Sequence, residues 1–228
     1  MLFVLLMIET IIFDLDGPIL DTKKRHYYCY RNILNQYGYE PLDIEKYWQL
    51  KRKGIHRREI LALTKAENID SEFLQNWLNL IETPSLLNLD TLQIGVKEKL
   101  EDLHNQGLQL ILVTLRSNPT YLSQQLDQLK LSQFFNHILV CEHQLGGIGK
   151  AEKIKQISPS INPNNSLWIG DTEIDIQGAR HFGCKIWAVS CGIRTKSYLA
   201  SFKPDFLSSD FANMDSILFN RGKYDSVQ

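Results

Sequence analysis

Apolar residues gather in short runs over the second half of the chain, and stretches with helical spacing separate these runs. Runs that are apolar throughout predict strands at residues 108–113, 137–140, 166–169 and 185–189. Apolar residues three and four positions apart predict helices at residues 96–105, 119–130, 150–157 and 173–182. Strands that alternate with helices imply right-handed crossovers and a parallel sheet. We therefore expect an α/β fold with helices on both faces of the sheet.

An earlier apolar run, at residues 10–13, belongs to the same predicted sheet, although a segment of different character follows it. Residues 22–90 show no strand pattern and carry two amphipathic helical faces. These faces consist of Tyr27, Tyr30, Ile33, Leu34 and Tyr37, and of Phe73, Leu74, Trp77, Leu78 and Ile81. The pattern predicts a discontinuous α/β core domain of residues 1–21 and 91–228. An all-helical insert of residues 22–90 interrupts it, with residues 84–90 as the return linker.

The composition is that of an ordinary globular protein. The chain has 228 residues, of which 43% are hydrophobic, and a formal net charge of -1. Nucleic acids and anionic membranes attract proteins with a basic excess, so the near-neutral charge argues against both as partners. We expect a small-molecule ligand instead. The sequence leaves the oligomeric state open.

The cysteine pattern indicates free thiols. Cys29, Cys141, Cys184 and Cys191 form no C-x-x-C pair, and most of them stand in or beside apolar runs. This usage predicts a reducing, cytoplasmic location. The apolar start at residues 1–8 lacks the basic segment and cleavage site of a signal peptide, and it is too short to span a membrane. Met1 and Met7 are alternative starts.

Two acidic signatures follow predicted strands. One is Phe13-Asp14-Leu15-Asp16-Gly17, and the other is Gly170-Asp171-Thr172-Glu173-Ile174-Asp175. Ligands of open parallel sheets bind beyond the carboxyl ends of the strands, so we expect these carboxylates at one edge. Clustered carboxylates need a cation or a proton to offset their charge. The signatures therefore predict a divalent-metal site with one carboxylate left for chemistry.

Further polar residues fall at the same predicted edge. Thr114 follows the strand at residues 108–113, and Arg116 comes two residues later. Lys150 opens a helix after the loop Gly146-Gly147-Ile148-Gly149. Arg116 is placed to reach a substrate anion, although a solvent-facing loop arginine is an equal alternative.

These residues resemble the motifs of the haloacid dehalogenase-like phosphohydrolases. The run from Asp14 to Asp21 is similar to their first motif, Thr114 to the second, Lys150 to the third, and the signature at residues 170–175 to the fourth. The motifs occur in the family's order over nearly the whole chain. The helical insert is placed like the cap of the phosphoglycolate-phosphatase-like and β-phosphoglucomutase-like branch. The resemblance implies a Rossmann-like core with a helical cap.

The resemblance also implies a mechanism. Asp14 would attack phosphorus and become an aspartyl phosphate. Asp16 would protonate the leaving oxygen and later deprotonate the hydrolytic water. The side chains of Asp14 and Asp171 and the backbone carbonyl of Asp16 would hold Mg²⁺.

Other matched positions take supporting roles in the resemblance. Thr114 would bind the phosphoryl oxygens, and Lys150 would offset their charge. Asp175 would lie behind the metal ligands or orient Lys150. The basic run at residues 51–58 is similar to the family's cap substrate loop, in which a basic residue follows a glycine. Lys53 and Arg57 are its expected contacts with an anionic substrate, with a merely solvated charged face as the alternative.

The sequence favours a Mg²⁺-dependent phosphohydrolase acting on a small phosphorylated metabolite, with phosphoglycolate suggested by resemblance alone. A phosphomutase would use the same intermediate and pass the phosphoryl group to a sugar hydroxyl. A degenerate regulatory protein that binds a phosphorylated ligand is a third alternative. Pro18 supports the last, because the family commonly has Thr or Val there. The intact Asp14, Asp16, Lys150 and Asp171 oppose it.

Overall fold

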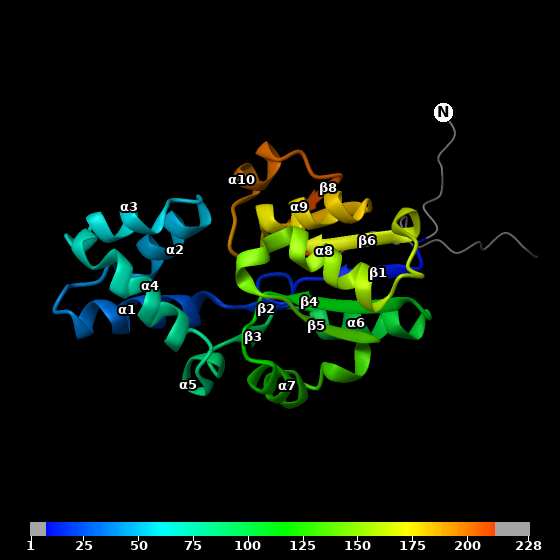
Figure 1. The fold of residues 1–228 in the computed structure, drawn as a ribbon, viewed down its shortest axis with the longest axis horizontal. Helices are drawn as coiled ribbons and strands as arrows, with labels where there is room; N and C mark the ends of the chain where they lie inside the picture. Colours follow the sequence, from blue (N-terminus) through cyan, green and yellow to red (C-terminus); the bar gives the residue numbers. More distant parts are fainter. Residues whose placement is uncertain (1–7, 213–228) are drawn as a thin grey trace, which may run out of the picture.

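Six parallel strands form the central sheet of the computed structural model, which describes residues 8–212 (Figure 1). The strand order is β5-β4-β1-β6-β7-β8. Their bounds are β1 (Thr10–Phe13), β4 (Gln109–Thr114), β5 (His137–Val140), β6 (Ser166–Gly170), β7 (Lys185–Val189) and β8 (Phe206–Ser208). All pairs are parallel, which confirms the predicted fold class. The short β8, which is only partly buried, was not predicted.

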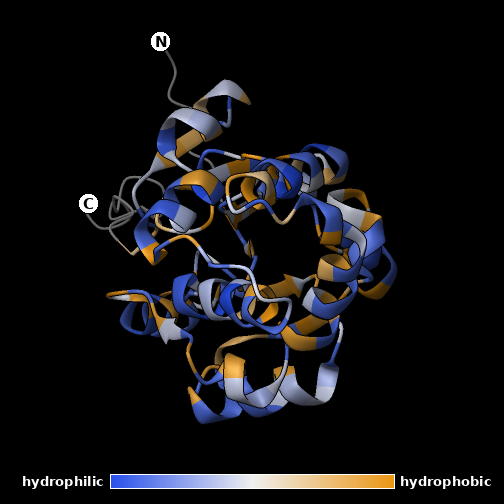
Figure 2. Cartoon of the chain, turned by 90° about the vertical axis from the view of Figure 1, so that its left-hand side faces the viewer, coloured by the Kyte–Doolittle hydropathy of each residue, from blue (hydrophilic) through white to orange (hydrophobic). Residues whose placement is uncertain are grey.

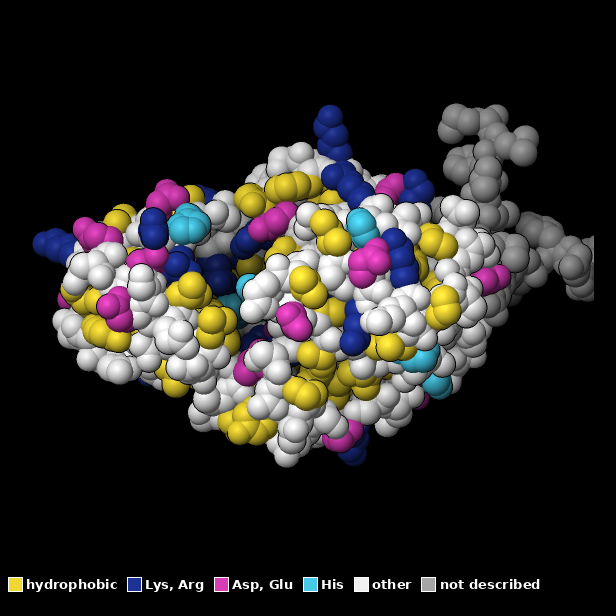
Figure 3. Space-filling model, viewed as in Figure 1, with side chains coloured by type: hydrophobic (Ala, Val, Ile, Leu, Met, Phe, Trp, Pro, Cys, Tyr) yellow, Lys and Arg dark blue, Asp and Glu magenta, His cyan; other side chains and the backbone are white. Residues whose placement is uncertain are grey.

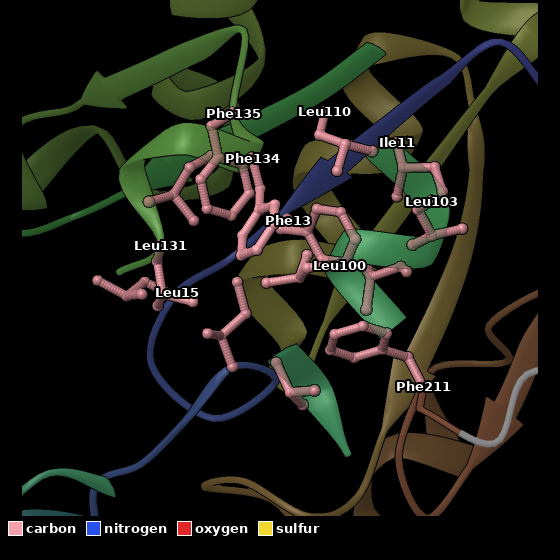
Figure 4. Close-up of a cluster of buried hydrophobic side chains, with 14 of the residues drawn as sticks. Ile11, Phe13, Leu15, Leu100, Leu103, Leu110, Leu131, Phe134, Phe135 and Phe211 are labelled. Carbon is pink, nitrogen blue, oxygen red and sulfur yellow. The ribbon is translucent and has the colours of Figure 1, made fainter. Parts of the chain in front are cut away.

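Alternate residues of β1 face opposite sides of the sheet, and each side is covered by its own helices. Ile11 and Phe13 pack with α6 (Val96–Asn105) and α7 (Pro119–Gln128). Figure 4 shows this cluster around Phe13, whose ring centre lies 5.1 Å from that of Phe211. Both faces of the strand are therefore apolar, which explains why its sequence does not alternate.

Ile12 faces the other side of the sheet. It packs with α8 (Gly146–Ile157), α9 (Glu173–Phe182) and α10 (Lys196–Ser201). The indole of Trp168, on β6, is fully buried in the same layer.

The glycine-rich segment before Lys150 was predicted to be a loop, and this prediction is wrong. Helix α8 already begins at Gly146. Gly147 lies against the backbone of α9, where an added Cβ would be 2.1 Å from the carbonyl oxygen of Ile174. Gly147 therefore allows α8 and α9 to approach closely, which offsets its poor helix propensity.

The segment between β2 (Leu20–Asp21) and β3 (Thr91–Leu92) is helical. It comprises α1 (Lys23–Gln36), α2 (Ile44–Arg52), α3 (Arg57–Ala62), α4 (Asp70–Leu80) and the short α5 (Pro84–Leu87), which lies where a plain linker was expected. These helices share an apolar cluster around Tyr30, Ile33 and Phe73, and they form the lobe at the left of Figure 1. Figure 2, viewed from this side, shows hydrophobic and hydrophilic residues mixed along each of them. The two strands pair antiparallel at the base of the lobe, so both connections to the sheet lie side by side.

The four cysteines are free thiols, and Cys29 and Cys141 are buried. Among residues 8–212, no helix has the length and apolar character needed to cross a membrane. The alternative start at Met7 lies outside the described residues.

Candidate active site

Two neighbouring strands bring the acidic signatures together. The backbone N–H of Asp14 donates to the carbonyl of Ile169 at 3.0 Å, which extends the pairing of β1 with β6 to the sheet edge. Asp14 follows β1 and is 8% exposed, whereas Asp171 follows β6 and is fully buried. Thr114 ends β4 on the other side of β1 and is also buried.

Three carboxylates share this edge with one ammonium group. Ligand oxygens of Asp14, Asp171 and Asp175 lie within 4.8 Å of one another. Lys150 Nζ is 2.8 Å from Asp14 Oδ1 and donates a hydrogen bond to Asp175 Oδ1 at 2.9 Å. Burial raises the pKa of Asp14 to about 7, although Lys150 opposes this shift. Burial, then Asp175 and Asp14, raise the pKa of Asp171 well above its usual value. The cluster therefore lacks positive charge.

The residues present fit a hard divalent cation. Asp171 Oδ2 accepts a hydrogen bond from the N–H of Ile193, but its buried Oδ1 has no hydrogen-bond partner among the described residues. Gly17 and Gly192 lie against the same carboxylate. A Cβ added to Gly17 would be 2.1 Å from Asp171 Oδ2, and one added to Gly192 would be 2.0 Å from it. A fixed, buried carboxylate with a free oxygen is suited to Mg²⁺, which prefers oxygen ligands.

Both oxygens of Asp175 are already engaged. Oδ1 binds Lys150, and Oδ2 accepts from the hydroxyl of Thr172 at 2.7 Å and from its N–H at 3.2 Å. The contact with the N–H of Thr172 is one half of the capping box at the start of α9. Asp175 is thus fixed by the helix terminus and in turn fixes the ammonium group of Lys150.

Asp16 is held by two arginines. Arg116 donates to both of its oxygens at 2.7 Å, and Arg25 Nη2 lies 2.8 Å from Oδ1. Asp90 pairs with the same arginines, at 3.0 Å from Arg25 and 3.3 Å from Arg116. Burial acts to raise the pKa of Asp16, but Arg116 and then Arg25 hold it well below the usual range. Arg116, expected to reach a substrate anion, binds an aspartate of the protein here.

Sequence reasoning missed Arg25 and Asp90 altogether. Arg25 lies in the first turn of α1, and Asp90 immediately precedes β3. A lone charge at either place is typical of a solvated surface, and only the folded chain brings the two together. The buried network links both connections of the helical lobe to Asp16.

A cleft of about 1700 Å³ lies between the helical lobe and the sheet edge, and Figure 3 shows basic side chains inside this hollow. Asp14, Asp16, Thr114 and Lys150 line it from the sheet, whereas Tyr30, Tyr47, Lys51, Phe73 and Trp77 line it from the lobe. Arg57 also lines the cleft, but it is paired with Asp70 at 2.6 Å. Lys53 is exposed and does not line it.

Pro18 leaves the turn after β1 intact. The turn is closed by the N–H groups of Gly17, Ile19 and Leu20, which bond to carbonyls of Leu20 and Leu15. The missing N–H at position 18 is therefore not needed there. Gly17 adopts a φ of 112°, a conformation that side chains rarely allow.

The chain belongs to the haloacid dehalogenase-like hydrolase family, whose model matches residues 11–189. It is similar to Pyrophosphatase PpaX of Anoxybacillus flavithermus, with 26% identity over 92% of this chain and 97% of the relative. The same enzyme of Bacillus cereus strain Q1 is 26% identical, over 92% and 96% of the two chains.

Solved structures agree on the fold. A haloacid dehalogenase-like family hydrolase from Streptococcus pneumoniae superposes with a TM-score of 0.73 at 20% identity, over 88% of this chain and 93% of that one. A predicted phosphoglycolate phosphatase from Haemophilus somnus gives a TM-score of 0.72 at 20% identity, over 93% and 97%.

Proposed function

We propose that the chain is a Mg²⁺-dependent phosphohydrolase that removes phosphate from a small phosphorylated metabolite. The observation that carries the proposal is Lys150, which is 2% exposed and bridges Asp14 and Asp175 beside the free oxygen of Asp171. The curated relatives named pyrophosphatase support a phosphoryl substrate. The family supports hydrolysis.

In this proposal, the carboxylate of Asp14 attacks phosphorus in line with the leaving oxygen. The bond from phosphorus to that oxygen breaks, and an aspartyl phosphate forms on Asp14. Lys150 and Thr114 hold the phosphoryl oxygens. Asp14, Asp171 and the backbone carbonyl of Asp16 would hold Mg²⁺, which offsets the negative charge of the phosphoryl group when bound.

Asp16 is proposed to move protons at the second step. Its contacts with Arg25 and Arg116 favour the ionised form, which suits the removal of a proton from the hydrolytic water. Water then attacks the phosphorus, and the bond to Asp14 breaks with release of phosphate. Protonation of the leaving oxygen at the first step requires Asp16 to gain a proton beforehand.

The test is a phosphate-release assay on a panel of phosphorylated metabolites, including pyrophosphate and phosphoglycolate, with and without Mg²⁺. We expect turnover that needs Mg²⁺ and is lost in Asp14→Asn. The exposed carboxylate of Asp102 on α6 supplies the control, Asp102→Asn, which should keep full activity. Absence of turnover on every compound would contradict the proposal. Isomerisation of a sugar phosphate without phosphate release would favour the mutase instead.

A further inference from the structure

Lys51 is a cation of the cleft wall that lacks a counter-charge. It lies on α2 and lines the cleft, with its Nζ 5.2 Å from the centre of the Trp77 ring. Within residues 8–212, it forms no ion pair. The arginines of the cleft differ in this respect, because each is matched by a carboxylate. Arg57 binds Asp70, for example, and Arg194 binds Glu173 with two hydrogen bonds.

The surroundings of Lys51 are short of negative charge. Burial first, and then the nearby guanidiniums of Arg194 and Arg25, lower its pKa to about 8. Glu173 acts in the opposite direction, but its two oxygens are taken by Arg194. The ammonium form still dominates at pH 7. A half-buried cation without a counter-charge favours an anion bound beside it.

The wall beside Lys51 is aromatic, and the nearby Arg25 and Arg194 are each paired with a carboxylate. Trp77 stacks against Phe73, with ring centres 5.8 Å apart, and the His26 ring lies 5.4 Å from that of Trp77. Burial first, and then Lys51 and Arg25, lower the pKa of His26 well below its usual value. His26 is therefore neutral at pH 7, and Lys51 supplies the charge of this corner.

The end of α2 is hydrogen-bonded to the loop of residues 190–194, which follows β7 and contacts Asp171. Arg52 donates to the carbonyls of Ser190 and Arg194, and Arg194 donates to the carbonyl of Lys51 at 3.1 Å. The same loop gives Asp171 a hydrogen bond from Ile193. These contacts keep the backbone of Lys51 in a set position relative to the carboxylate cluster, as a ligand spanning both sites would require.

We infer that Lys51, with the Trp77 ring beside it, binds a second anionic group of the substrate at the lobe end of the cleft. This inference rests on the proposed function and narrows it. The substrate would carry a carboxylate or a second phosphoryl group in addition to the phosphoryl group that is removed. Lys51 takes the role expected for Lys53, which lies outside the cleft, and for Arg57, which Asp70 already neutralises.

Calorimetric titration of non-hydrolysable ligand pairs in the presence of Mg²⁺ tests the inference. One pair is 3-phosphonopropionate and propylphosphonate, which differ by a carboxylate. The other is methylenediphosphonate and methylphosphonate, which differ by a phosphonate group. In the wild type, we expect the second anionic group of at least one pair to strengthen binding roughly tenfold or more. The pair that shows this effect identifies the anion.

Lys51→Met should abolish this preference while keeping the affinity for the simpler ligand, which also shows that the variant is folded. Lys53→Met is the matched control and should keep the preference, because Lys53 lies two residues away and outside the cleft. Lys51→Arg should retain it in large part. Should Lys51→Met fail to fold, Lys51→Gln replaces it with the same expectation.

Equal wild-type binding within both pairs, no binding of any ligand, or a preference that survives in Lys51→Met would each overturn the inference. Because binding is measured without turnover, the two proposals fail separately. A wild type that prefers the ligand with the second anionic group through Lys51, but hydrolyses no phosphate ester, would contradict the proposed phosphohydrolase function. A wild type that hydrolyses phosphate esters but binds both members of each ligand pair equally well would contradict the Lys51 site alone.

Discussion

Arg116 binds both carboxylate oxygens of Asp16 through two hydrogen bonds of 2.7 Å, one from Nε and one from Nη2. The pair joins the loop after β4 to the loop after β1, so the proposed proton carrier is fixed by the α/β core. Arg116 is also within 3.3 Å of the fully buried carboxylate of Asp90. The guanidinium group therefore compensates two acidic side chains at once.

Arg116→Met should lower the free energy of unfolding by about 3–5 kcal/mol, because it leaves buried carboxylates short of a counter-charge. Urea denaturation measures the change. The control is Arg180→Met on α9, whose exposed guanidinium bonds, within residues 8–212, only to backbone carbonyls of Phe202 and Lys203. Its effect should stay within about 0.5 kcal/mol. Equal stability of the two variants would show that the ion pairs of Arg116 with Asp16 and Asp90 contribute little to the free energy of unfolding.

Mg²⁺ should stabilise the folded chain by filling the carboxylate cluster. A ligand at a hundred times its Kd adds about 2.7 kcal/mol, so thermal unfolding with and without Mg²⁺ is a sensitive measure. Asp171→Asn should remove most of this shift, because it replaces the carboxylate that has a free oxygen. The shift should persist in Asp102→Asn. An unchanged shift in Asp171→Asn would place the cation elsewhere.

His26 should make the protein less stable in acid. Its folded-state pKa is depressed, so the unfolded chain binds the extra proton when the pH falls below about 6.5. Stability from this group is present above that value and is lost toward lower pH. Between pH 7.5 and 5.5, wild type should lose up to about 1.4 kcal/mol more than His26→Phe, as measured by urea denaturation. The exposed His143 gives the control, since His143→Phe should lose as much as wild type. Parallel losses in wild type and His26→Phe would contradict the assignment.

Gly147→Ala should destabilise the chain, although alanine favours helices. The new methyl group would lie 2.1 Å from the carbonyl oxygen of Ile174 and 2.7 Å from the backbone nitrogen of Gly178, so α8 and α9 must separate. The cost should be about 1–3 kcal/mol in urea denaturation. Ile157→Ala, at an exposed position of α8, should change stability far less. A neutral Gly147→Ala would mean that the helix contact tolerates the shift.

The strands were predicted well because their runs are apolar throughout, as burial on both faces requires for β1 and most of β7, although the edge strand β5 is partly exposed. Residues 10–13, 137–140 and 185–189 coincide with β1, β5 and β7. The start of α8 was missed because glycines lower local helix propensity, and the contact with α9 that favours them is tertiary. Helix α10 and strand β8 are short and only partly buried, so their pattern is weak.

The carboxylates and Lys150 could be found from the sequence because each lies just after a strand or in the first turns of the helix that follows one. Charge pairing could not be found this way. Arg25, Asp90 and the unpaired state of Lys51 depend on how the helical lobe packs against the sheet. The basic run at residues 51–58 indicated an anion, but the folded lobe decides which of its residues faces the cleft.

The central claim is that Asp14 forms a covalent bond to the phosphoryl group of the substrate. The most direct measurement is mass spectrometry of peptides from enzyme quenched in acid during turnover with Mg²⁺. The peptide containing Asp14 should gain the mass of one phosphoryl group, and the same peptide of Asp14→Asn should gain none. Phosphate release by the wild type with no phosphorylated peptide under these conditions, or with the phosphoryl group on another residue, would contradict this claim.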